Sequence, residues 1–263
     1  MRKIGSLVFL ILTAIAASPQ SQEVPKVPRV IVMGVNGMEW DIIRPLVMKG
    51  EMPNLTRVIE KGAYGKLRTL SAPNCPKIYS AIATSSRPED NGITGFRIRG
   101  ITANTGMLKR QTLASILSEH GVKVGLANVP ATFPAFPVNG YMVSGMLTRG
   151  KNCEDGILCS PKLSEVQGGD AVYPHNLQAE LIKNVGDFYI DCSRMPSAKE
   201  LSVNAPLTIN KWLQQVSVVR AQQTKLFDYL LSHHPTQFTM LVQSCEDRTG
   251  HWLYPIQPHN VGY

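Results

Sequence analysis

The sequence predicts an α/β fold, a mainly parallel sheet with helices on both faces. Short apolar runs of strand length alternate along the chain with amphipathic stretches of helical period, and this alternation is typical of parallel sheets that are covered on both sides. Of the 263 residues, 43% are hydrophobic and 17% are charged. This composition supplies one sizeable core and is not that of a disordered chain.

The first predicted strand covers residues 30–33, an apolar run that the turn residues 34–37 follow directly. A helix is expected over 53–61, where Gly62 stands just past the end as a stop signal. The apolar face of this helix is formed by Leu55, Val58 and Ile59. A strand followed by a helix in this way is the start of an alternating α/β pattern.

The same alternation continues through the second half of the chain. A helix is predicted over 109–120, with Leu113, Ile116 and Leu117 on its apolar face, and a short buried strand over 123–128. The longest helical pattern covers 210–232 and precedes a strand at 238–242. Its core-facing positions are Trp212, Leu213, Val216, Val219, Leu226, Phe227 and Leu230. These elements complete the sequence basis for a sheet covered on both faces.

Residues 1–17 are predicted to be a secretory signal peptide. Arg2 and Lys3 form the charged start, residues 4–12 are mostly apolar, and residues 14–16 are the small and apolar residues Ala-Ile-Ala before the cleavage point. The apolar part is shorter than the roughly 20 residues that a membrane-spanning helix needs, although an uncleaved anchor is the alternative. We therefore expect export to the periplasm or the medium, without stable membrane insertion after cleavage. Residues 18–28 are then an extended lead-in to a domain at 29–263.

The formal net charge of +8 comes from basic residues that are scattered along the chain. Nucleic-acid-binding proteins more often show runs of Lys and Arg interleaved with aromatic residues. We therefore expect no nucleic-acid partner. A modestly basic surface suits an anionic ester, and it is also what an ordinary solvated surface looks like.

If the protein is exported, its five cysteines lie in an oxidising compartment, where disulfides form. Cys153 and Cys159 bracket a short turn, so a local disulfide between them is one interpretation, although the pairing stays open. An odd number of cysteines leaves at least one thiol free in a monomer. No cysteine pair has the spacing of a zinc finger.

Residues 147–205 differ in character from the rest of the chain. This segment is richer in Gly, Ser, Pro and Cys and shows weak periodicity. Two interpretations carry equal weight: a cap inserted between sheet elements, or a long surface loop with little structure of its own.

The apolar strand and turn at 30–37, followed some 40 residues later by the segment 75–84, resemble the alkaline phosphatase superfamily, in particular its type I phosphodiesterase and nucleotide pyrophosphatase branch. In that branch the first strand ends in Gly-x-Asp-Gly, whose Asp binds a metal. A Thr or Ser nucleophile comes later, nine residues before a Thr-Gly pair. In this chain the two positions hold Asn36 and Cys75.

Further segments carry the resemblance from about residue 30 to residue 251. They are the helix and turn motifs of residues 40–43, 52–55 and 60–65, the turn 87–93, the stretch 124–146, and Asp247-Arg248-Thr249-Gly250-His251. Asn91 stands where the turn of the family usually has His. The last segment matches the Asp-x-x-x-His metal-ligand motif. No single motif is diagnostic, but the order and spacing of these segments together make the resemblance fairly specific.

The resemblance implies an alkaline-phosphatase-like fold with two divalent metals, usually zinc, on either side of the nucleophile. Carried over to this chain, it places Cys75 at the nucleophile position and Asn36, Asp247 and His251 at metal-ligand positions. If it holds, these four side chains converge at the carboxyl edge of the sheet, where ligands bind in open α/β folds. The simpler alternatives are turn chemistry for Asn36, a buried inert thiol for Cys75, and an ion pair or an ordinary loop His for Asp247 and His251. His175, His233, His234 and His259 carry no motif.

The resemblance also implies a second Asp-His ligand pair and a final His downstream of residue 251. We therefore expect a C-terminally truncated member, either a fragment of a longer protein or a decayed member, with an incompletely liganded metal. The function it predicts is metal-dependent hydrolysis of a small phosphorylated substrate, impaired in this chain. The main alternative is a non-catalytic remnant that binds an anion or one metal. A sulfatase is less favoured, because Cys75-Pro76-Lys77 departs from the Cys-x-Pro-Ser-Arg motif. Substrate identity, monoester or diester preference and oligomeric state stay open.

Overall fold

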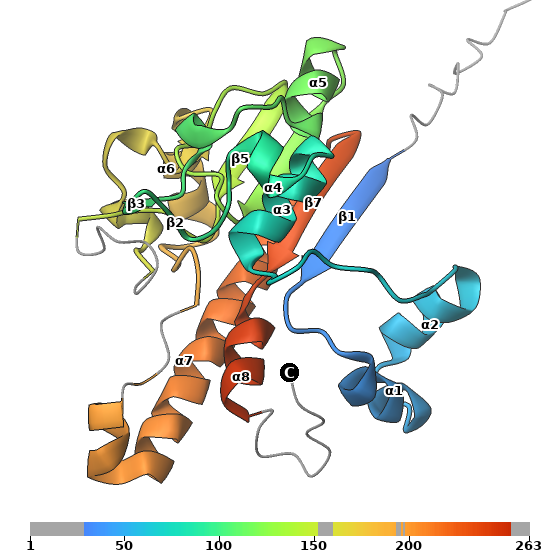
Figure 1. The fold of residues 1–263 in the computed structure, drawn as a ribbon, viewed down its shortest axis with the longest axis vertical. Coiled ribbons are helices and arrows are strands. Elements are labelled where there is room, and N and C mark those ends of the chain that lie inside the picture. Colours follow the sequence, from blue (N-terminus) through green and yellow to red (C-terminus); the bar gives the residue numbers. More distant parts are fainter. Residues whose placement is uncertain (1–28, 152–159, 193–195, 197, 254–263) are drawn as a thin grey trace, which may run out of the picture.

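The computed structural model of the chain describes residues 29–151, 160–192, 196 and 198–253. A five-stranded sheet with the order β1-β7-β4-β5-β6 forms its centre (Figure 1). Its strands are β1 (Val30–Val35), β7 (Phe238–Gln243), β4 (Val124–Val129), β5 (Gly140–Ser144) and β6 (Val172–Tyr173). The first four run parallel and β6 pairs antiparallel with β5. The predicted α/β fold class is therefore confirmed.

Helices cover both faces of this sheet (Figure 1). On one face lie α3 (Cys75–Thr84) and α5 (Leu113–Glu119), whose Tyr79 and Ala114 pack against strand residues such as Met240. On the other face lie α6 (Asn176–Asn184) and α7 (Ala198–His233), which share a core with Leu241. The remaining small elements on the first side are α4 (Pro88–Asn91) and the hairpin of β2 (Arg97–Ile98) and β3 (Ile101–Thr102).

The sheet is unevenly covered, because β4 lies at its centre and β1 at its edge. All six residues of β4 are buried. In β1, by contrast, Val30, Ile31 and Met33 are each about half exposed. The two helices that follow β1, α1 (Trp40–Met48) and α2 (Pro53–Lys61), lie apart from the sheet (Figure 1).

Two predicted helices differ from expectation in what they bury. The helix expected over 109–120 begins only at Leu113, where the Thr112 side chain accepts a hydrogen bond from Ser115 N–H at 3.1 Å. It contacts the sheet through the small Ala114, so Leu113 and Ile116 stay more than 40% exposed. In α2 the bounds are as predicted, but no residue is fully buried, and Val58 faces solvent.

The segment 147–205 is built into the main core over much of its described length. It contains the short helix Leu163–Glu165, β6, α6 and the start of α7. Leu163, Leu181 and Phe188 are almost fully buried against α7. The expectation of a surface loop with little structure is therefore wrong for this part, and the cap stays a prediction.

Three expectations lie outside the described residues: the signal peptide at 1–17, the lead-in at 18–28, and the local disulfide between Cys153 and Cys159. Within the described part of the chain, none of the helices has the combination of length and apolar character that crossing a membrane requires.

Candidate functional site

Asn36 lies at the carboxyl end of β1, where its backbone N–H donates to the carbonyl oxygen of Gln243 at 2.9 Å and extends the ladder with β7. Its side-chain amide is engaged at both ends. The Nδ2 group donates to the Cys75 sulfur at 3.4 Å, and Oδ1 accepts a hydrogen bond from the Tyr79 hydroxyl at 2.5 Å. Tyr79, Asn36 and Cys75 thus form one chain of hydrogen bonds.

Cys75 is the first residue of α3 and is fixed by the start of that helix. The Asn74 side chain caps the helix by accepting from Lys77 N–H at 3.1 Å, and Pro76 follows at a position that favours helix initiation. Among the described residues, Cys75 is the free cysteine. Burial, followed by the negative charges of Asp247 and Asp191, raises the pKa of the Cys75 thiol to about 12, with Arg248 opposing the shift. The sulfur is therefore a protonated thiol at neutral pH.

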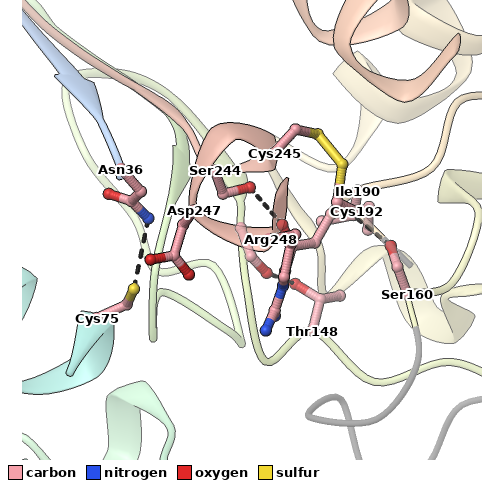
Figure 2. Close-up of polar contacts among 12 residues, drawn as sticks. Asn36, Cys75, Thr148, Ser160, Ile190, Cys192, Ser244, Cys245, Asp247 and Arg248 are labelled. Atoms are coloured by element: carbon pink, nitrogen blue, oxygen red, sulfur yellow. Dashed lines mark hydrogen bonds and ion pairs between the residues drawn. A yellow bond between two sulfur atoms is a disulfide. The ribbon is translucent and has the colours of Figure 1, made fainter. Parts of the chain in front are cut away.

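Asp247 reaches the same place from the first turn of α8 (Cys245–Leu253). Figure 2 shows the Asn36, Cys75 and Asp247 side chains gathered at the end of the strand. The close approach depends on Gly37, because a Cβ atom there would lie 2.7 Å from the Asp247 Cα. Gly37 also has a φ of +74°, which glycine adopts without strain.

His251 follows Asp247 by one helical turn, and the two side chains face each other. The distance from His251 Nε2 to Asp247 Oδ1 is 3.6 Å. His251 is 65% exposed, whereas Asp247 is 23% exposed. The structure therefore brings Asn36, Cys75 and Asp247 together at the carboxyl edge, with His251 at the rim.

A cluster that sequence reasoning missed anchors α8 in this position. A disulfide joins Cys192 to Cys245 at the start of the helix. Asp191 accepts hydrogen bonds from the Ser244 hydroxyl and, at 3.5 Å, from Arg248 Nη2. Its own backbone N–H donates to the Ser160 hydroxyl at 2.7 Å.

The disulfide closes a loop across 53 residues of sequence. Constraint of the unfolded chain by a loop of this size is worth roughly 4 kcal/mol in the chain-entropy account. The sequence contained both cysteines, but five cysteines without a characteristic spacing gave no signal for this pairing.

Asn91, which stands where the related turn usually has His, has a structural role. It is completely buried, and its Nδ2 group donates at 3.2 Å to the Thr84 hydroxyl and to the Ser86 carbonyl. Its Oδ1 accepts from Ile93 N–H at 2.9 Å. These bonds tie α4 to the end of α3.

The side chains of the site do not fit the metal pair that the resemblance implies. In the part of the chain that the structure describes, no three His, Cys, Asp or Glu side chains are placed to hold a metal ion. The Asn36 oxygen that would face a metal accepts the Tyr79 hydroxyl instead, and Cys75 is protonated. Asp247 and His251 are the two donors that remain, whereas zinc in proteins usually has four ligands.

Comparison with known proteins decides the family. Residues 30–258 match the sequence profile described as type I phosphodiesterase / nucleotide pyrophosphatase. The chain belongs to this family. Type I phosphodiesterases and nucleotide pyrophosphatases form part of the alkaline phosphatase superfamily, are typically metal-dependent, and act on small phosphoester substrates. No curated protein matches this family member.

Proposed function

We propose that this type I phosphodiesterase family member is a hydrolase of phosphoric esters whose activity is strongly impaired. The observation that supports the proposal is the convergence of Asn36, Cys75 and Asp247 at the carboxyl edge of the sheet. These are the positions at which the family resemblance implies a metal-binding carboxylate, a nucleophile and a second metal ligand. The substrate in this proposal is a small phosphorylated compound.

The impairment follows from the chemistry of two side chains. A nucleophile must be activated, and the Cys75 thiol stays protonated at neutral pH because it is buried beside Asp247. Asn36 offers a neutral amide where a carboxylate would supply negative charge for a metal. Loss of one such electrostatic group commonly costs about 100- to 1,000-fold in rate, and two losses leave little activity.

A divalent metal, zinc being the usual one in the family, is in our proposal held weakly through Asp247 and His251. Two ligands on one helical turn provide part of the usual set of four.

A non-catalytic protein that binds an anion or a single metal is the second candidate. The chain of hydrogen bonds from Tyr79 to Asn36 to Cys75 favours the loss of catalysis, because these groups already satisfy one another, and Asp247 with His251 is the pair that would meet a single metal.

The decisive experiment restores the residues of the family and measures both hydrolysis and zinc binding. The protein is purified from the exported fraction of expressing cells, and its intact mass checks the proposed loss of residues 1–17. Steady-state hydrolysis of bis(p-nitrophenyl) phosphate with added zinc is then compared for the parent, Cys75→Ala, and the double variant Asn36→Asp/Cys75→Thr. Zinc affinity is measured by calorimetry on the same proteins.

We expect the parent to hydrolyse at nearly the rate of Cys75→Ala, and the double variant to exceed it by about 100-fold or more. We also expect the double variant to bind zinc more tightly. Robust turnover by the parent that Cys75→Ala abolishes would show that the site is not impaired. A double variant that gains zinc affinity but no turnover would overturn the hydrolase proposal in favour of the binding protein.

A further inference from the structure

A cavity of about 100 Å³ lies between the sheet and the two helices α3 and α5. Side chains of β1, β7 and β4 line it on the side of the sheet. The rest of its lining comes from α3, from the start of α5 with the residues before it, and from the turn after β4. Apolar cavities of about 150 Å³ in proteins stay dry and bind benzene or xenon, so this one has room for a group of a few carbon atoms.

The lining of this cavity offers almost nothing to a polar ligand. Its described residues include no charged side chain, and its hydroxyl groups belong to Tyr79, Ser80, Thr112 and Thr132. Each of these hydroxyl groups already forms a hydrogen bond within the chain, at distances between 2.5 and 3.1 Å. A polar molecule would therefore find few partners to replace its hydrogen bonds with water, whereas a hydrocarbon group needs none.

Tyr79 forms a fixed wall of the cavity. Its ring lies across Gly34 of β1, where a Cβ atom would be 2.5 Å from the Tyr79 hydroxyl oxygen. The hydroxyl donates to Asn36 Oδ1 at 2.5 Å. Rotation of the ring into the empty space would break this hydrogen bond, so Tyr79 does not close the cavity.

Two residues of the lining reach the surface and mark the opening of the cavity. Ile82 of α3 is 53% exposed, and Leu113 of α5 is 43% exposed. Leu113 belongs to the apolar face that the sequence predicts for its helix, yet packing leaves it uncovered. Large apolar side chains at this opening offer contact to the part of a ligand that does not fit inside.

The cavity is drawn out along β4. Its lining includes Val129 at the carboxyl end of this strand. It also includes Phe238, which pairs in register with Val124 at the amino end of β4. A space that follows a strand in this way fits an unbranched chain better than a ring.

We propose that this cavity binds the alkyl chain of a small amphiphilic molecule. The chain enters between Ile82 and Leu113 and lies along β4, and the polar head group of the molecule stays in solvent. The site lies under α3, apart from the hydrogen-bonded side chains of Asn36 and Cys75, and does not depend on the hydrolase proposal.

The test is titration calorimetry with n-hexanol, up to about 10 mM, and with hexanediol and benzyl alcohol as comparison probes. Ala83→Leu fills the cavity from α3, and Leu113→Ser removes the apolar group at its opening. Matched controls are Ala81→Leu on α3 and Ile116→Ser on α5, because neither residue lines the cavity and Ile116 is 41% exposed, much like Leu113.

We expect saturable binding of n-hexanol that weakens about 10-fold or more in Ala83→Leu, weakens several-fold in Leu113→Ser, and is unchanged in both controls. Hexanediol should bind about 10-fold or more weakly than n-hexanol, because its second hydroxyl would be buried without a partner. We also expect Ala83→Leu without a probe to be as stable to heat as the parent or more stable, because its added methyl groups enter empty space.

Three results would overturn the proposal. The first is the absence of saturable n-hexanol binding, or binding that Ala83→Leu leaves unchanged. The second is tighter binding of benzyl alcohol than of n-hexanol, because this would assign a ring and not a chain to the cavity. The third is a clear loss of thermal stability in Ala83→Leu beyond that of Ala81→Leu, because this would show that the space under α3 is already filled.

Discussion

Cys75 shows how the surroundings of one residue decide its chemistry. A thiolate is a strong nucleophile and a good metal ligand, but a thiol is neither. Here the sulfur is half-buried at the start of α3, accepts from the Asn36 amide, and lies in the field of Asp247. The residue type left the choice between nucleophile and inert thiol open, and these neighbours favour the thiol.

The first prediction concerns the alkylation of Cys75 by iodoacetamide, followed by mass spectrometry with a chelator present. The pKa rises from 9.0 to about 12, so the thiolate fraction at pH 8 falls about 1,000-fold below that of an unperturbed cysteine. We expect alkylation to be slower by a similar factor and its rate to keep rising towards pH 12. Asp247→Asn removes a charge that raises the pKa, so it should speed alkylation at pH 8. A rate that levels off near pH 9 would contradict the burial argument.

The helix α8 is the element on which the site depends. It carries Asp247 and His251, and three features hold it: the disulfide from Cys192, the hydrogen bonds to Asp191, and the close contact with Gly37. Of these, the contact with Gly37 sets the distance between α8 and the end of β1. Loss of this contact should therefore shift α8 relative to β1 and leave the disulfide and the Asp191 hydrogen bonds in place.

The second prediction compares two glycines with the same backbone angle. Gly37 and Gly50 both have a φ of +74°, but a Cβ atom at Gly50 would meet nothing within 4 Å. Both alanine variants carry the backbone strain, of about 1–2 kcal/mol. Gly37→Ala also forces α8 away from β1, so we expect it to cost a further ~1–3 kcal/mol in urea unfolding. Equal losses in the two variants would show that the contact with Asp247 is not tight.

At the scale of the whole molecule, packing is dense around β4 and sparse around β1. Strand β4 is hydrogen-bonded on both sides and buried throughout. Within the part of the chain that the structure describes, β1 pairs with β7 alone and leaves apolar side chains half exposed. Exposed edges of this kind open more readily than central strands.

The third prediction is a gradient of hydrogen exchange across the sheet. Amides of β4 and the centre of β7 should exchange only by global unfolding, because their opening exposes the core on both faces. Amides of β1 and of α2, which has no fully buried residue, should exchange by local opening and therefore faster. The measurement is native-state exchange followed by mass spectrometry of peptides. Equal protection of the β1 and β4 peptides would contradict the uneven packing.

The fold class and the positions of the main elements could be predicted from the sequence. The strand expected at 238–242 is β7, the strand expected at 123–128 is β4 shifted by one residue, and the helix expected over 210–232 is the main part of α7. These predictions succeeded because a strand buried on both faces is apolar throughout, and a long packed helix repeats its apolar residues every turn. The order of motifs also indicated which side chains lie at the ends of strands.

The tertiary structure alone decided which faces are buried and which polar groups are paired. Leu113 and Val58 look like core residues, yet they face solvent, because the neighbouring surfaces leave them uncovered. The link between Cys192 and Cys245 and the cavity between α3, α5 and the sheet join segments far apart in sequence. A local sequence pattern shows only the hydrophobic periodicity of one segment. The burial, charge environment and pairing of a side chain depend on the neighbouring segments that pack against it. The sequence by itself determined the architecture and the family of this protein, and the packing between distant segments determined the chemistry of its sites.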